Sequence, residues 1–74
     1  MKIKVTCESG YSSCDRPKAV EIDGIQHEVS EVLNEWREPH AKIFIVRLDN
    51  DLQLKLLFHE NTGEWEALEL FNSQ

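Results

Sequence analysis

Glycine is scarce in this chain, and its scarcity argues against several classes of enzyme. Three glycines occur in 74 residues, and Gly24 and Gly63 fall where tight turns are expected. Little backbone is left to cradle a phosphate, and the sequence has no phosphate-binding loop, nucleophile elbow or zinc-protease helix motif. No apolar stretch approaches the roughly 18 residues of a transmembrane helix, and no apolar run follows the N-terminal lysines to form a secretory signal. We expect one cytoplasmic domain spanning residues 1–74.

Cysteine is too rare, and too widely spaced, to indicate a metal site. Cys7 and Cys14 are separated by six residues, whereas paired zinc ligands usually have two to four between them. His27, His40 and His59 do not complete a finger-like set. We therefore expect neither a metal nor a cofactor. Cys7 should fill the core and Cys14 should lie in a loop, both as reduced thiols; a disulfide between them is the alternative.

Basic side chains are outnumbered by acidic ones, which makes nucleic acid and membranes poor candidates as partners. The chain carries 8 lysines and arginines against 14 acidic residues, a formal net charge of −6. Such a surface repels phosphate backbones and anionic lipid headgroups. The carboxylates are spread along the chain, and we interpret them as a solvated sheet face rather than a catalytic pair.

Alternation of apolar and polar residues is the strongest pattern in the sequence. Asp23 and Gly24 separate two alternating runs, and both residue types tolerate the positive φ that a type I′ hairpin requires. Asn50-Asp51 and the glycine turn at Gly63 repeat the pattern. The expected strands cover residues 2–7, 18–22, 25–37, 42–48, 52–60 and 64–71. Five or six short strands predict an all-β fold: a single small antiparallel meander or a partly open, SH3-like barrel.

Residues 30–37 allow two interpretations. Val32, Leu33 and Trp36 have helix-like spacing, which would make this segment a short helix with Ser30 as its N-cap. Alternatively the strand continues with a bulge near Ser30 and Glu31, which would place Val32, Asn34 and Trp36 on the inner face. We favour the bulged strand, because a two-turn helix has little independent stability.

Aromatic residues provide the best candidates for a binding site. We expect Trp36 and Trp65 to anchor the core, since indoles bury large areas. An indole exposed near Tyr11 would instead form an aromatic patch for a peptide. Arg37 is placed to pair with a carboxylate or to stack on an aromatic ring. Tyr11, Trp36, Arg37 and Trp65 are therefore the candidate binding residues.

The histidines do not indicate catalysis. His27 falls on the apolar face of its expected strand, where a histidine is usually a hydrogen-bonded core or rim residue. His59 and Glu60 are consecutive, so alternation places their side chains on opposite faces. We expect no catalytic residue and no enzymatic activity.

A set of scattered positions resembles a known family. Arg16-Pro17, Gly24, Val29, Trp36-Arg37, Val46, Leu54 and Trp65 are similar to the pattern of small uncharacterised bacterial proteins of the DUF6504-like class. The resemblance covers roughly residues 16–68. It departs at Val20, where the family usually has an aromatic residue, and at Ile22-Asp23. Some of those proteins are associated with error-prone repair polymerases, so the resemblance implies at most a protein partner and no catalytic residue.

These observations favour a non-catalytic protein-interaction or accessory module. It would act on a protein partner or on a second copy of itself, since a small sheet with an uncovered edge can pair with its copy. Two alternatives stay open: a small barrel that binds single-stranded nucleic acid, and an accessory to a DNA repair polymerase. An enzyme or small-ligand carrier would need a pocket beside a histidine.

Overall fold

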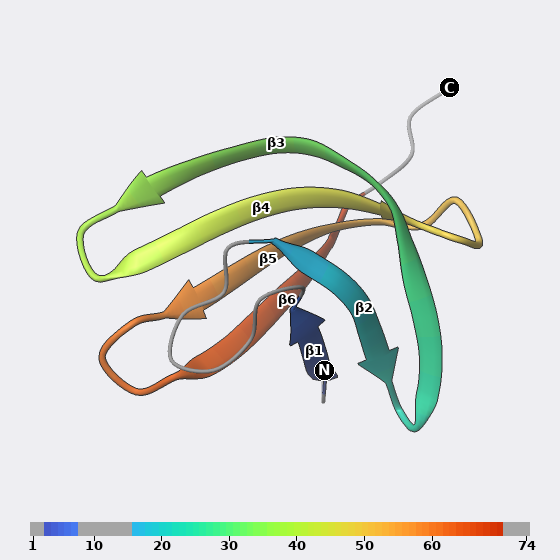
Figure 1. Cartoon of the computed structure of the whole chain (residues 1–74), viewed down its shortest axis with the longest axis horizontal. Helices are drawn as coiled ribbons and strands as arrows, with labels where there is room; N and C mark the ends of the chain where they lie inside the picture. The colour runs from blue at the N-terminus through green and yellow to red at the C-terminus, as the bar shows by residue number, and fades with distance from the viewer. Residues whose placement is uncertain (1–2, 8–15, 71–74) are drawn as a thin grey trace.

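The computed structural model describes residues 3–7 and 16–70, and it forms one antiparallel sheet curled into a half-barrel (Figure 1). The strands follow in chain order: β1 (Ile3–Cys7), β2 (Pro17–Ile22), β3 (Ile25–Glu38), β4 (Ala41–Leu48), β5 (Gln53–His59) and β6 (Glu64–Leu70). Each strand pairs with the next one along the chain, so β1 and β6 are the edges. The described residues contain no helix, which confirms the all-β meander and excludes the helix at residues 30–37.

Residues with positive φ make the tight reversals between strands. Asp23 and Gly24 have φ values of 52° and 87°, which confirms the predicted hairpin between β2 and β3. Gly63 is left-handed at 74°, as predicted. The turn predicted at Asn50-Asp51 is longer than expected, since β4 ends at Leu48 and β5 begins at Gln53. The backbone N–H of Leu48 donates to the carbonyl of Leu52 and closes this reversal, in which Asp51 is left-handed (φ 66°).

The core fills the inside of the curled sheet. Its fully buried side chains come from three strands: Val20, Phe44, Val46, Leu48, Leu54 and Leu56. Side chains from the two edge strands also pack on it, namely Ile3 and Val5 from β1 and Trp65 and Ala67 from β6. The edge strands lie near one another (Figure 1). Rolling one small sheet in this way gives it a common interior without a second layer.

Strand β3 is the long element that joins the two halves of the sheet, and it contains two irregularities. Its first part pairs with β2 and its second part with β4. The register shifts between Val29 and Glu31, as predicted, and shifts again between Val32 and Asn34. The first extra residue, Ser30, reverses the side-chain alternation along β3, and the second, Leu33, restores it.

The second bulge corrects the predicted orientation of Trp36. Val32 pairs with Val46 and packs on the core, as expected. Asn34 pairs with Ile45 and Trp36 with Ile43, and these partners alternate with the core residues of β4. The prediction that Asn34 and Trp36 face inward is therefore wrong, because Leu33 is an additional bulged residue. Trp36 is 38% exposed and does not anchor the core.

Candidate functional site

The outer face of the half-barrel carries apolar side chains where a solvated sheet would be polar. Directly paired residues point to the same side of a sheet, so the register defines rows across the strands. One row contains Trp36, Ile43 and Leu57, and the next contains Ile45, Lys55 and Leu68. We name the apolar members of these rows the outer patch: Trp36, Ile43, Ile45, Leu57 and Leu68. It spans β3 to β6.

Trp36 lies beside Ile43 at the β3 side of the outer patch. Ile43 is only 1% exposed although it does not belong to the inner core, and Trp36 is its partner across β3 and β4. The ammonium of Lys55 lies 5.8 Å from the centre of a Trp36 ring, so the stem of Lys55 reaches from β5 across β4. This arrangement shields Ile43 and leaves Trp36 and Leu68, which is 57% exposed, at the surface.

A hollow of about 410 Å³ adjoins the outer patch at the end where the β3–β4 and β5–β6 reversals lie. Ala41 and Leu57 supply apolar lining, and Glu38, His59 and Glu64 supply polar lining. Leu57 belongs to both the hollow and the patch. The Nε1 of Trp36 donates a hydrogen bond to Oε2 of Glu38 at 3.0 Å. The hollow and the patch therefore form one continuous surface.

The predicted binding residues do not form a single site. Trp65 packs inside the half-barrel, with its ring 4.9 Å from that of Phe58 and 6.1 Å from that of Phe44. This confirms Trp65 as a core anchor. Trp36 lies on the opposite face of the sheet.

Arg37 is the third candidate, and it does not extend the Trp36 surface. Arg37 follows Trp36, so alternation turns its side chain to the other side of β3. Its Nη2 lies 2.8 Å from Oε2 of Glu60, which confirms the predicted carboxylate pairing. Tyr11 lies outside the described residues.

Two histidines pair with carboxylates and tie neighbouring segments together. His59 Nε2 lies 2.6 Å from Oε1 of Glu66 on β6, rather than contacting its sequence neighbour Glu60. His27 faces Val20 across β2 and β3, and its Nδ1 lies 3.1 Å from Oδ1 of Asp49. The backbone N–H of Glu28 and the His27 side chain lower the pKa of Asp49. Both pairs have a structural explanation, and His27 is the hydrogen-bonded rim residue that was predicted.

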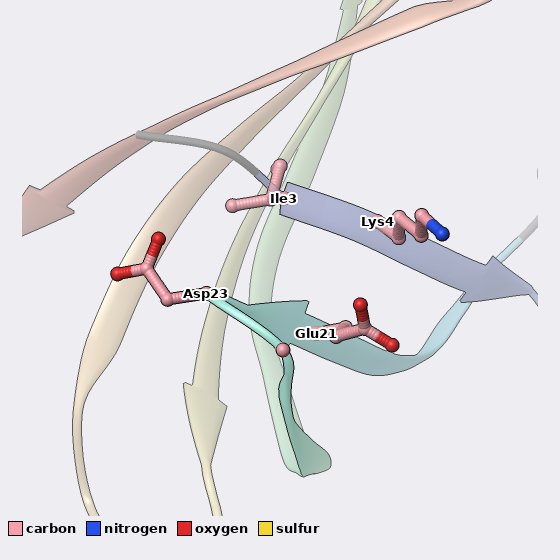
Figure 2. A pocket seen from close by; sticks show the side chains of 5 residues that line it. Ile3, Lys4, Glu21 and Asp23 are labelled. Carbon is pink, nitrogen blue, oxygen red and sulfur yellow. The ribbon is translucent and has the colours of Figure 1, made fainter.

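A second hollow, of about 250 Å³, lies beside the β2–β3 hairpin and offers no convergent chemistry. Ile3, Lys4, Glu21 and Asp23 line it, and Figure 2 shows the Asp23 side chain pointing away from Lys4 and Glu21. A catalytic site needs polar groups aimed at a common point. In the described part of the chain, no group of three or more histidine, cysteine or acidic residues is placed to hold a metal ion.

Cys7 is disulfide-bonded, so the prediction of a reduced thiol at this position is wrong. The chain's other cysteine, Cys14, lies outside the described residues. Within the described ranges, no helix is long and apolar enough to cross a membrane.

Comparison of the chain with protein-family models, curated proteins and solved structures finds no match. The resemblance to the DUF6504-like class therefore stays a prediction, and the outer face is described from its own chemistry.

The sequence pattern missed most of the outer patch. Ile43, Leu57 and Leu68 each looked like ordinary strand residues. One signal was present: β4 is apolar at consecutive positions, and a fold with a single sheet can bury only one of its two faces in a common core. The other face must remain outside, covered by long side chains or by a partner.

Proposed function

We propose that this protein is a non-catalytic interaction module that binds a protein partner through the outer patch. The observation that carries the proposal is the exposure of Trp36 and Leu68 at either side of a face whose central strands are also apolar. Exposed apolar patches rimmed by polar residues are typical of protein-binding surfaces. Tryptophan is also enriched among the residues that dominate interface energies.

Ion pairs between neighbouring strands support the proposal that the outer patch is a binding surface. His59 and Glu66 hold β5 to β6, and Arg47 and Glu31 hold β4 to β3 on the same face. These contacts fix the strands around the patch, and a preorganised surface loses less side-chain and loop freedom on binding than a loose one. We propose no enzymatic step, because His59, which lines the larger hollow together with His40, is paired with Glu66 across β5 and β6, and His27 is paired with Asp49 at the rim.

The experiment is a comparison of variants in a pull-down from the native host, identified by mass spectrometry. Leu68→Ser removes an exposed apolar side chain from the patch, and Ile25→Ser removes one that is 62% exposed at the β2–β3 hairpin. We expect the wild type and Ile25→Ser to retain the same protein in stoichiometric amounts, and Leu68→Ser to lose it. Equal retention by all three, or no retained protein, would overturn the proposal.

The identity of a retained protein would also test the predictions that rest on resemblance and composition. A repair polymerase would support the accessory role that the DUF6504-like resemblance implies. The cytoplasmic location stays a prediction, and the disulfide of Cys7 weighs against a strongly reducing compartment.

A further inference from the structure

Charge is unevenly distributed over the outer face. The hollow is bordered by the carboxylates of Glu38 and Glu64, and Glu66 lies in the adjoining row. The described residues that line the hollow include no lysine or arginine. The basic side chains of this face, Arg47 and Lys55, lie in rows farther along the strands. One end of the surface is therefore acidic, while its middle is apolar.

The hollow combines this acidity with an apolar floor. Ala41 is 9% exposed, and Leu57 is half-buried beside it. Lysine and arginine side chains suit such a place, because their stems cover apolar surface while their charged ends stay at the water boundary. An arginine has the further advantage that its guanidinium forms directed hydrogen bonds with carboxylates.

A second copy of the chain is a poor occupant for this face. Each copy carries a formal net charge of −6, so two copies repel one another overall. Like-charge contacts across an interface oppose association, whereas complementary potentials accelerate it. A basic segment of another protein gains from both the charge and the apolar patch.

We infer that the partner presents a basic, apolar-flanked peptide segment, with a lysine or arginine side chain in the hollow and a large apolar side chain on the outer patch. The inference rests on the proposed function and specifies the chemistry of its partner. The apolar side chain would contact Trp36 or Leu68. The basic one would lie over Leu57 with its charge near Glu38 and Glu64.

The test measures binding of three capped pentapeptides with arginine, glutamine or glutamate at the centre and leucine at the other four positions, because residues two apart share one face of an extended peptide. Isothermal titration gives the affinity, and amide chemical shifts of the ¹⁵N-labelled protein locate the contact. We expect the arginine peptide to bind most tightly, to weaken with added salt, and to shift the amide signals of Glu38, Leu57 and His59. Comparable binding of the glutamate peptide, or shifts confined to other strands, would overturn the inference.

Matched charge variants separate a specific contact from general attraction. The double variant Glu38→Gln/Glu64→Gln removes two charges at the hollow, and the glutamine oxygen at position 38 can still accept from the Trp36 indole. The control Glu21→Gln/Asp23→Asn removes the same charge beside the other hollow. We expect Glu38→Gln/Glu64→Gln to lower the affinity for the arginine peptide by about fivefold or more, and the control to lower it by less than about twofold. The reason is that two exposed ion contacts are lost only in the first variant. Equal losses would overturn the inference.

The outcomes distinguish this inference from the proposed function. If Leu68→Ser loses the natural partner while Glu38→Gln/Glu64→Gln retains it fully, the outer patch is the binding surface, and the inference that the partner presents a basic segment is wrong. If a single-stranded oligonucleotide binds the same face more tightly than the arginine peptide, both are wrong.

Discussion

His27 and Asp49 join the first part of β3 to the reversal between β4 and β5. Nδ1 of His27 lies 3.1 Å from Oδ1 of Asp49, and the other carboxylate oxygen of Asp49 accepts from the backbone N–H of Glu28 at 3.2 Å. The backbone N–H of Asp49 in turn donates to the carbonyl of Glu28 at 2.9 Å. These bonds hold the part of β3 that pairs with β2 against the residue that follows the end of β4.

The contacts of Asp49 predict a loss of stability at acidic pH. Its pKa lies below the ordinary value of 3.8, chiefly because the N–H of Glu28 and then the His27 side chain favour the carboxylate. A lowered folded-state pKa contributes stability above the unfolded-state pKa of about 3.8, and this contribution disappears as the pH falls through the lower folded-state value. Urea unfolding should therefore show Asp49→Ala to be less stable than wild type at pH 7.

Repeating the urea unfolding of wild type and Asp49→Ala at low pH tests whether the Asp49 charge is the cause. The stability difference between wild type and Asp49→Ala should shrink as the pH is lowered below about 3.8. A difference that stays constant between pH 7 and pH 2 would mean that the carboxylate charge does not stabilise the reversal.

Truncation of a central core side chain should unfold much of the protein. Leu54 is fully buried in the inner cluster, and Leu→Ala substitutions at such sites cost about 2–5 kcal/mol. A single core of this size supplies roughly 3–5 kcal/mol of net stability. Thermal denaturation followed by circular dichroism should show Leu54→Ala largely unfolded near 37 °C. Leu68→Ala, at a site 57% exposed, should melt within a few degrees of wild type.

The hairpin between β2 and β3 depends on the backbone of Gly24. Its φ is +87°, and a Cβ placed there would meet no atom within 4 Å. Any cost of Gly24→Ala therefore comes from the backbone alone, and we expect about 1–2 kcal/mol from chemical denaturation. Gly24→Asn should recover part of that loss, because asparagine tolerates the left-handed region better. Equal stability of all three proteins would contradict the turn geometry.

Deletion of Leu33 should be tolerated, because the bulge is one residue longer than its partner segment. Val32 pairs with Val46 and Asn34 with Ile45, so these pairs remain in register when Leu33 is removed. Deletion of Lys55 is the control, because it turns every later residue of β5 to the opposite face. Circular dichroism should show a cooperative strand-rich fold for the first deletion and none for the second. Loss of folding in both would argue against the bulge.

Period-two alternation was sufficient to predict the strands and their order. The expected segments agree with the observed strands to within one residue at every end, and the positive-φ hairpin at Asp23 follows directly from its residue types. The prediction that Trp65 anchors the core, made because indoles bury large areas, is also confirmed.

Trp36 could not be placed because its orientation depends on two bulges rather than one. Val29, Val32 and Leu33 are all apolar, so residue type does not show which of them is the extra one. An error of one residue moves every later side chain to the other face. The outer patch was missed for the same reason, since it exists only when Trp36 joins the outward side chains of β4 and β5.

The orientation of the two tryptophans is the claim on which the binding face depends, and quenching of their fluorescence by acrylamide tests it directly. Trp65→Phe leaves only Trp36, and Trp36→Phe leaves only Trp65. Trp36 should emit at the longer wavelength and be quenched more strongly, since it is 38% exposed on the outside of the sheet whereas Trp65 packs against Phe58. If Trp36 proves as shielded as Trp65, it lies in the core and the outer patch does not exist.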